Sequence, residues 1–275
     1  MVAFGAAIAV AFLGAAAIGR AVGPLERGKS TSSSHGEEMG GDEIAAASPA
    51  GLAVAADGFR LVATRTTLQA AKPQRFAFRI VDEAGEPLRR YDVEHERRLH
   101  LIVVRRDLTG FQHLHPKLSA DGTWAATLAP LEPGAYRAFA DFSTGGHKTV
   151  LGADLLVPGA TRVHARPPVR EAAPAGPYQV VLDPGTFKAG ATEQLAFRVT
   201  RGGKTAFDEV GRYLGARGHL VLLRPGDLAY VHAHADEDAL QFETTFPSPG
   251  RYAAFLQFRA GGAVRTAAFS VEVTR

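Results

Sequence analysis

Six of the ten histidines in this chain occupy matched positions in two stretches of sequence. They form two sets with the spacing H-x12-H-x-H, namely His100, His113 and His115, and His219, His232 and His234. Three neutral imidazoles form a donor set suited to Cu(II) or Zn(II) and leave a coordination position open. The pattern therefore predicts that each stretch holds copper or another divalent metal ion.

A hairpin in the second stretch would gather its histidines. Pro225 and Gly226 are residues that favour a tight turn, because proline presets φ and glycine adopts positive φ without strain. A two-residue turn there places His219 opposite His232, with His234 two residues further along on the same face. We therefore expect the three rings to converge.

The first stretch allows two registers. A turn at residues 106–107 places His100 opposite His113, and a turn at residues 108–109 places His100 opposite Lys117. Both registers keep the three imidazoles on one face, because they differ by an even number of residues and side chains alternate along a strand. Convergence is expected in either case.

Further donors surround these sets, and the histidines also have a purely structural interpretation. The additional donors are Glu94, His95, Asp236 and Glu237, together with His35 and Met39 in the segment HGEEMGG. Histidines on a hairpin can instead bond backbone carbonyls or stack on aromatic rings. Because a duplication also copies structural residues, both interpretations stay open at this point.

The histidines lie within an internal repeat. HLIVVRRDLTGFQHLHP begins at His100 and matches HLVLLRPGDLAYVHAHA, which begins at His219. Further on, PGAYRAFADF from Pro133 matches PGRYAAFLQF from Pro249. Short alternating runs between Pro and Gly signals predict six or seven antiparallel strands in each copy. We therefore expect an all-β chain of two tandem immunoglobulin- or cupredoxin-like β-sandwiches after an N-terminal transmembrane helix.

The predicted organisation has five parts. They are a transmembrane anchor or signal (1–23), a flexible tether (24–50), the first β-sandwich (51–158), a Pro-rich linker (159–176) and the second β-sandwich (177–275). In the second sandwich the expected strands are 178–182, 194–200, 219–224, 228–234, 240–246, 251–258 and 263–273. The tyrosines after Pro-Gly, Tyr136 and Tyr252, are typical of a tyrosine corner.

The first 23 residues carry no charge before Arg20 and contain a run of roughly 18 apolar or small residues, the lower limit for a membrane span. They lack the basic n-region of a signal peptide, which favours an uncleaved anchor. Arg27 and Lys29 follow this segment and by the positive-inside rule argue for a cytoplasmic C-terminal side, although long domains cross regardless of such a bias. We expect the sandwiches to lie outside the cytoplasm.

Composition excludes several classes of function. The net charge is only +3, with no basic stripe, so nucleic acid is a poor partner. The absence of cysteine excludes disulfides, thiolate metal sites and cysteine nucleophiles. The sequence has no G-x-S-x-G, no H-E-x-x-H and no phosphate-binding glycine loop. We therefore expect a protein that is not an enzyme.

The block LHLIVVRRDLTGFQHLHP, with the DGTW and PGAYRAFADF that follow it, resembles the YtkA-like and FixH-like envelope domains of heavy-metal-binding type. The overall plan is similar to that of membrane-anchored secreted proteins of actinobacteria. The resemblance implies an extracytoplasmic location and the binding of copper or another heavy metal. The motif residues carried over by position are His100, His113, His115 and Pro116. The second copy departs from the motif, since Ala235 stands where Pro is expected.

The expected function is that of a membrane-anchored extracytoplasmic binding protein that holds copper or a similar ion at the two repeated sites. The alternative is a structural module of the cell envelope that binds a partner protein without metal.

Overall fold

The structure is a computed structural model that describes residues 49–162, 164, 172–231 and 233–275. The predicted anchor (1–23), nearly all of the predicted tether and the predicted ligand His232 lie outside these residues. The described residues contain no helix with the length and hydrophobicity of a membrane span. Apart from one short 3-10 helix, their regular structure is β-strand, so the all-β prediction is confirmed.

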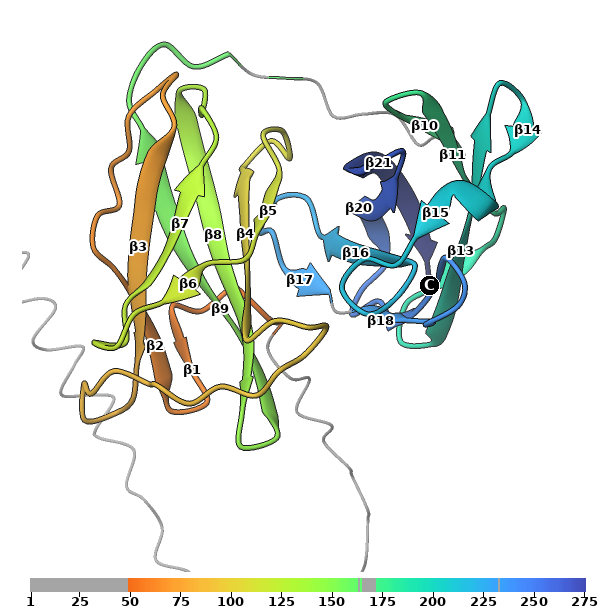
Figure 1. The fold of residues 1–275 in the computed structure, drawn as a ribbon. Helices are drawn as coiled ribbons and strands as arrows, with labels where there is room; N and C mark the ends of the chain where they lie inside the picture. Colours follow the sequence, from red (N-terminus) through yellow and green to blue (C-terminus); the bar gives the residue numbers. More distant parts are fainter. Residues whose placement is uncertain (1–48, 163, 165–171, 232) are drawn as a thin grey trace, which may run out of the picture. The chain divides into compact units, whose positions relative to one another are not determined.

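The first sandwich consists of two antiparallel sheets (Figure 1). Its strands are β1 (Ala55–Ala56), β2 (Phe59–Ala63), β3 (Gln74–Val81), β4 (Leu99–Arg105), β5 (Gln112–Leu114), β6 (Lys117–Leu118), β7 (Trp124–Leu128), β8 (Gly134–Thr144) and β9 (His147–Val157). One sheet has the order β1-β2-β3-β7-β6, and the other, here the β8 sheet, has the order β5-β4-β8-β9. Phe76 and Phe78 of β3 share a buried core with Leu101 of β4 and Tyr136 of β8.

The second sandwich repeats this plan. Its elements are β10 (Ala172–Ala175), β11 (Tyr178–Leu182), β12 (Phe187–Lys188), β13 (Thr192–Arg201), β14 (Lys204–Thr205), η1 (Phe207–Glu209), β15 (Val210–Gly211), β16 (Gly218–Leu223), β17 (Tyr230–Val231), β18 (Ala233–Ala235), β19 (Gln241–Thr245), β20 (Gly250–Ala260) and β21 (Ala263–Thr274). One sheet has the order β10-β11-β13-β19-β18, with β14 paired to β13. The other, here the β20 sheet, has the order β12-β21-β20-β16-β17, with β15 paired to β20.

Two tyrosines have the geometry predicted from the Pro-Gly-x-Tyr pattern. The hydroxyl of Tyr136 donates to the Glu132 carbonyl at 2.9 Å, and that of Tyr252 donates to the Ser248 carbonyl at 2.9 Å. Both rings are buried, so each hydroxyl satisfies its hydrogen bond inside the fold. The tyrosine corner is thus built twice.

The ends of the predicted tether and linker take part in the fold. Ala50, the last residue of the predicted tether, accepts a hydrogen bond from the Tyr230 amide at 2.9 Å. The segment Ala172–Ala175 belongs to the predicted Pro-rich linker and contains Pro174, yet it forms β10. β10 lies at the edge of its sheet, where a missing amide donor is tolerated, and this position explains the difference.

A third hydrophobic core joins the two sandwiches. On β4, Leu99, Leu101 and Val103 pack into the first sandwich, whereas the alternate residues Ile102 and Val104 face the other way. β16 alternates in the same manner. The buried members of this joining core are Ile102, Val104, Phe139, Val221, Leu223, Leu228, Tyr230, Ala253 and Phe255. The β8 and β20 sheets are therefore buried on both faces.

The joining core contains reciprocal aromatic pairs. Phe111 stacks on Phe255 with ring centroids 4.1 Å apart, and Tyr230 contacts Phe139 with centroids 5.6 Å apart. Phe111 and Tyr230 are equivalent positions of the repeat, as are Phe139 and Phe255. In each pair, the position of Phe111 in one copy thus contacts the position of Phe139 in the other copy. This reciprocity is the contact pattern of an isologous, two-fold interface.

Candidate metal centre

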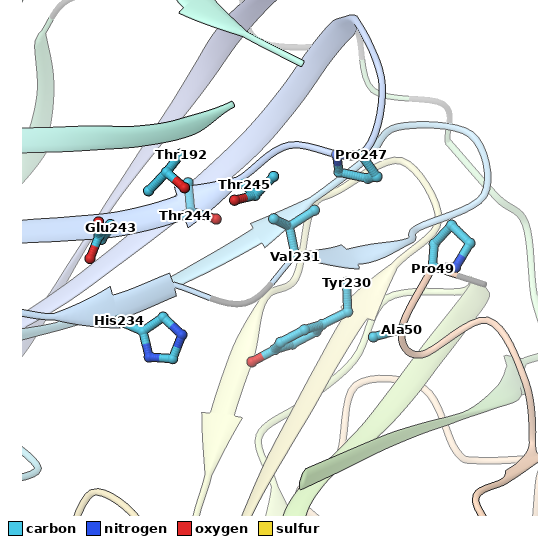
Figure 2. Close-up of a pocket in the computed structure, with 10 residues that line it drawn as sticks. All are labelled: Pro49, Ala50, Thr192, Tyr230, Val231, His234, Glu243, Thr244, Thr245 and Pro247. Carbon is cyan, nitrogen blue, oxygen red and sulfur yellow. The ribbon is translucent and has the colours of Figure 1, made fainter. Parts of the chain in front are cut away.

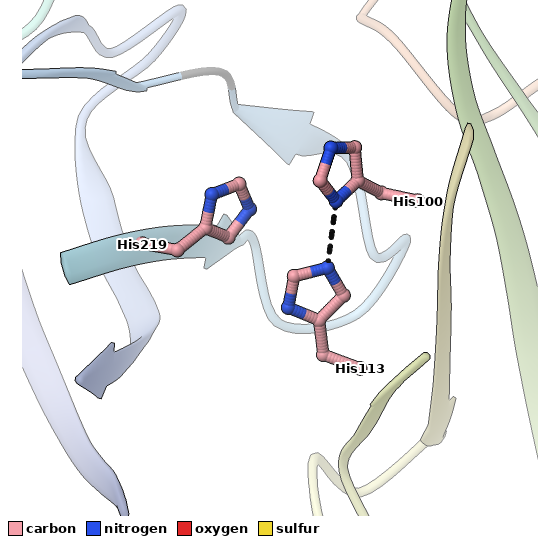
Figure 3. Close-up of side chains that lie close together, drawn as sticks. All are labelled: His100, His113 and His219. Atoms are coloured by element: carbon pink, nitrogen blue, oxygen red, sulfur yellow. Dashed lines mark hydrogen bonds between the residues drawn. The ribbon is translucent and has the colours of Figure 1, made fainter. Parts of the chain in front are cut away.

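Histidines from both sandwiches meet at the edge of the joining core. His100 lies on β4, His113 on β5 and His219 on β16, and Figure 3 shows their three rings turned toward one another. One ligand nitrogen of each ring lies within 4.8 Å of those of the other two. The ring centroids are 5.2 Å apart for His100 and His113, 5.1 Å for His100 and His219, and 4.7 Å for His113 and His219. These three residues are called the histidine triad below.

The register of the first hairpin lies between the two that were predicted. Ile102 pairs with His113, so His100 lies opposite neither His113 nor Lys117. Arg105 and Thr109 close a three-residue loop instead of a two-residue turn. Side chains still alternate as predicted, so the first set converges: the centroid of His115 lies 5.2 Å from that of His100 and 4.9 Å from that of His113.

The second hairpin also differs from its prediction. Arg224 and Ala229 close a four-residue loop, and Leu222 pairs with Val231, which shifts the expected register by two residues. β17 ends at Val231, and His234 lies on β18, which pairs with β19 in the opposite sheet. His219 therefore joins the first set, while His234 lies exposed on a different sheet.

Two hydrogen bonds orient the rings of the triad. His113 Nδ1 lies 2.7 Å from Gln257 Oε1, and Gln257 Nε2 donates to Thr266 Oγ1 at 3.1 Å. His100 Nε2 lies 3.3 Å from the Glu94 carbonyl oxygen. With Gln257 in this orientation, His113 donates through Nδ1 and His100 through Nε2, which leaves a lone pair on His113 Nε2 and on His100 Nδ1.

Those two lone pairs face each other at 3.0 Å, the contact drawn as a dashed line in Figure 3. Two lone pairs repel unless a cation or a shared proton lies between them. Two metal–nitrogen bonds of about 2.0 Å at a tetrahedral angle separate their nitrogens by about 3.3 Å, close to this distance. The hydrogen bonds on the far side of each ring are the outer-shell partners that ligating histidines usually have. The residues present therefore fit a bound metal ion.

Burial keeps the candidate ligands neutral. Desolvation, with the nearby His115 as a smaller cause, lowers the pKa of His100 to about 3. Desolvation also holds the pKa of His113 well below its ordinary value. It lowers the pKa of His115 to about 4, with the positive charge of Arg97 as a second cause. Neutral imidazoles are the form that binds metal.

Two more histidines flank the triad. Within the described residues, His115 Nε2 is buried and makes no hydrogen bond. His95, on the turn before β4, has its ring centroid 5.6 Å from that of His219 and 6.2 Å from that of His100. His95 was noted in the sequence only as an additional donor. Its proximity to His219 could not be read from one hairpin, because the two residues belong to different copies of the repeat.

An acidic group lies beside the triad. Asp141 of β8 pairs across the sheet with His100 and is buried. It accepts a hydrogen bond from the Tyr230 hydroxyl of the second sandwich at 3.2 Å and lies 3.7 Å from Lys148 Nζ. This contact adds a polar bond between the sandwiches next to the histidine triad.

A pocket of about 620 Å³ has Tyr230 and His234 among the residues that line it (Figure 2). It is lined by Pro49, Ala50, Thr192, Tyr230, Val231, His234, Glu243, Thr244, Thr245 and Pro247. Figure 2 shows His234 and Tyr230 projecting from the same side of their strands. Glu243 of β19 pairs with His234 across the sheet. The other predicted donors Asp236 and Glu237 follow β18, and no metal-binding group with them is found among the described residues.

The profile of one protein family, described as a domain of unknown function (DUF8832), matches residues 53–158 and again residues 172–275. No curated protein matches the sequence.

Solved structures with similarity to the chain include the Escherichia coli adhesin FdeC, with 14% identity, 81% of this chain and 66% of that chain covered, and a TM-score of 0.28. The fibronectin(III)-like modules of Clostridium thermocellum CbhA share 10% identity over 78% of this chain and 92% of that chain, with a TM-score of 0.23. The chain thus spans just under two thirds of the first and most of the second. These TM-scores are low, and the sandwich architecture follows from the strand pairing and cores of the chain itself.

Proposed function

The chain belongs to the DUF8832 family and carries two copies of the family's domain. From this premise we propose that the two copies together hold one copper or similar divalent ion at His100, His113 and His219. This proposal replaces two separate sites with one shared site. The observation that carries it is the 3.0 Å contact between His100 Nδ1 and His113 Nε2, because both nitrogens present lone pairs when the outer hydrogen bonds are made.

The donor set supports a borderline or softer transition metal. Imidazole nitrogen suits copper and zinc, whereas Ca²⁺ and Mg²⁺ prefer oxygen ligands. His115 lies beside the triad, and its buried Nε2 has no hydrogen-bond partner among the described residues. When bound, the ion would supply positive charge between rings that are otherwise neutral.

The cellular setting is part of the same proposal. The apolar first 23 residues support a single-pass anchor, and the resemblance to YtkA-like and FixH-like domains supports a location outside the cytoplasm. The protein then acts as a binding protein of the cell envelope, not as an enzyme. A partner in the envelope would receive or deliver the ion.

Metal titration tests the shared site. Cu(II) and Zn(II) are each titrated into the full-length chain, in competition with a chromophoric chelator. We expect one tight site per chain, and we expect H113A and H219A each to weaken it strongly, although the two residues lie in different sandwiches. H147A is the matched control, because His147 is exposed at the start of β9. H35A tests whether the N-terminal segment contributes weak metal binding to the titration.

Unchanged stoichiometry and affinity in both H113A and H219A would remove the triad from the site. Loss of metal binding in H113A but not in H219A would indicate a site confined to the first sandwich.

A second candidate is a metal-free structural role for the same rings. If the Gln257 amide is turned over, it donates to His113 Nδ1, and His113 Nε2 then donates to His100 Nδ1. The histidines then act as polar contacts between sandwiches of an envelope module that binds a partner protein. Nitrogen-15 NMR of the rings in chelator distinguishes the candidates, since this arrangement protonates His113 Nε2 with and without added Zn(II).

A further inference from the structure

His95 sits on a turn that strains its own backbone. Glu94 and Arg97 exchange both backbone hydrogen bonds, at 2.8 and 2.9 Å, and so close a two-residue turn. Its central residues His95 and Glu96 have φ of 48° and 62°. Positive φ at both central positions defines a type I′ turn, which favours Asn and Gly. Non-glycine residues persist in such conformations where surrounding structure or function requires them.

The second copy of the repeat builds the same turn from different residues. Tyr213 and Ala216 form the equivalent bridge, and Leu214 and Gly215 have φ of 60° and 84°. Leu214 is buried and apolar, and Gly215 relieves strain at the second position. The turn is therefore a feature of the shared fold, whereas the imidazole at its first position belongs to the first copy alone.

The turn holds His95 next to two members of the triad, His219 and His100. A side chain at Gly215 would begin 3.9 Å from Glu96 Cγ, so the two equivalent turns adjoin. The His95 ring lies edge-on to His219, with centroids 5.6 Å apart and planes at 77°. Two imidazoles bound to one ion have centroids about 5 Å apart at a tetrahedral angle and about 6.4 Å apart when opposite. The distances of 5.6 and 6.2 Å from His95 to His219 and His100 fall within this range.

The same turn orients a member of the triad. The Glu94 carbonyl, which opens the turn, lies 3.3 Å from His100 Nε2 and fixes the tautomer that frees His100 Nδ1. Burial, with the positive charge of Lys148 as a further cause, lowers the pKa of His95. One turn thus connects an outer hydrogen bond of the triad with an additional nitrogen donor.

We infer that His95 is a further ligand of the ion, carried to the site by this strained turn. The inference rests on the proposed function. A fourth imidazole fills the position that three histidines leave open, and four nitrogen donors of which two lie nearly opposite each other suit Cu(II) in tetragonal geometry. The site is then a closed holding site with no position left for substrate.

The test counts imidazoles. H95N keeps a residue that tolerates positive φ and removes the ring, and H95L installs the residue of the second copy. Cu(II) is bound to the full-length wild-type chain and to both variants, and pulsed EPR counts the coordinated imidazole nitrogens. We expect one fewer in each variant and an affinity lower by at least about tenfold, since loss of even an outer-shell partner costs ~10- to 100-fold.

Glu96→Gly is the matched control. It gives the first copy the Gly of the second copy and should leave the imidazole count and the affinity unchanged. An unchanged count in H95N, in a chain whose binding still requires His113 and His219, overturns the inference and leaves the proposed function standing. Failure of the wild-type chain to bind Cu(II) overturns both.

Discussion

The rings of His100 and His219 stack with centroids 5.1 Å apart and an interplanar angle of 11°. The two residues are the same position in the two copies of the repeat. Their contact places the candidate metal centre where the two sandwiches meet, close to the local two-fold axis that relates them. Properties of the site and of the joining core should therefore depend on each other.

The outer hydrogen bond of His113 should contribute to metal affinity. Q257L removes the acceptor for His113 Nδ1, and we expect the dissociation constant for Zn(II) to rise by ~10- to 100-fold. Q257E keeps an acceptor and should preserve the affinity. Competition titration measures both variants, and equal affinities in wild type and Q257L would show that the ring needs no orientation by Gln257.

The joining core should hold the sandwiches together energetically. Phe255 is buried and stacks on Phe111, so F255A is expected to lower the free energy of unfolding by about 3–5 kcal/mol. A double-mutant cycle with F111A should give a coupling of about 0.5–1.5 kcal/mol for the aromatic pair. Guanidinium denaturation measures each term. Strict additivity would argue against the contact in solution.

Acid should destabilise the metal-free protein. The pKa of His100 is about 3 in the folded state, and an unfolded histidine titrates near ~6.5. Between these values the unfolded state binds more protons, so the contribution of the neutral ring is complete above about pH 6.5 and falls as the pH drops toward 3. Its slope is up to about 1.4 kcal/mol per pH unit.

Denaturant titrations at pH 7.5, 6, 5 and 4.5 in chelator measure this slope. H100N should flatten it, and H147N should leave it unchanged. A free energy of unfolding that is independent of pH across this range would show that the fold does not lower the pKa of His100.

Metal should stabilise the native state by mass action. At a free concentration of 100 times the dissociation constant, the gain is about 2.7 kcal/mol, which raises the melting temperature by roughly 5–10 °C for a protein of this size. Differential scanning calorimetry with Zn(II) measures the shift. Chelator should reverse it, and H219A should abolish it. An equal shift in H219A would place the stabilising ion elsewhere.

Local pattern predicted the strands well. The second copy was expected to carry a strand at 251–258, and β20 spans Gly250–Ala260. Side chains alternate along it, and Tyr252 and Phe258 both face the core of the second sandwich. These features depend on neighbours along the chain, which a sequence displays directly.

The composition of the site was not predicted, because register depends on loop length. Both hairpins were assumed to turn on two residues, whereas Leu108 and Leu228 take positive φ and lengthen the loops. His219 lies on β16 of the β20 sheet, whereas His234 lies on β18, which pairs with β19 in the other sheet. No motif in the sequence marks that change of sheet.

One signal for the joining core was present. The run LIVV after His100 is apolar at every position, which is typical of a strand buried on both faces. It indicates that something covers the second face of β4 without identifying the covering surface. Only the packing of the two copies identifies His219 as a neighbour of His100.

The reciprocal aromatic pairs have a consequence for how the candidate metal centre assembles. An isologous interface of this kind ordinarily forms between separate subunits, and its occupancy then falls on dilution. Here a single chain carries both halves, so their encounter is intramolecular and is set by the length of the connecting segment. The ion-binding geometry should consequently persist at the low copy numbers at which a two-subunit version would dissociate.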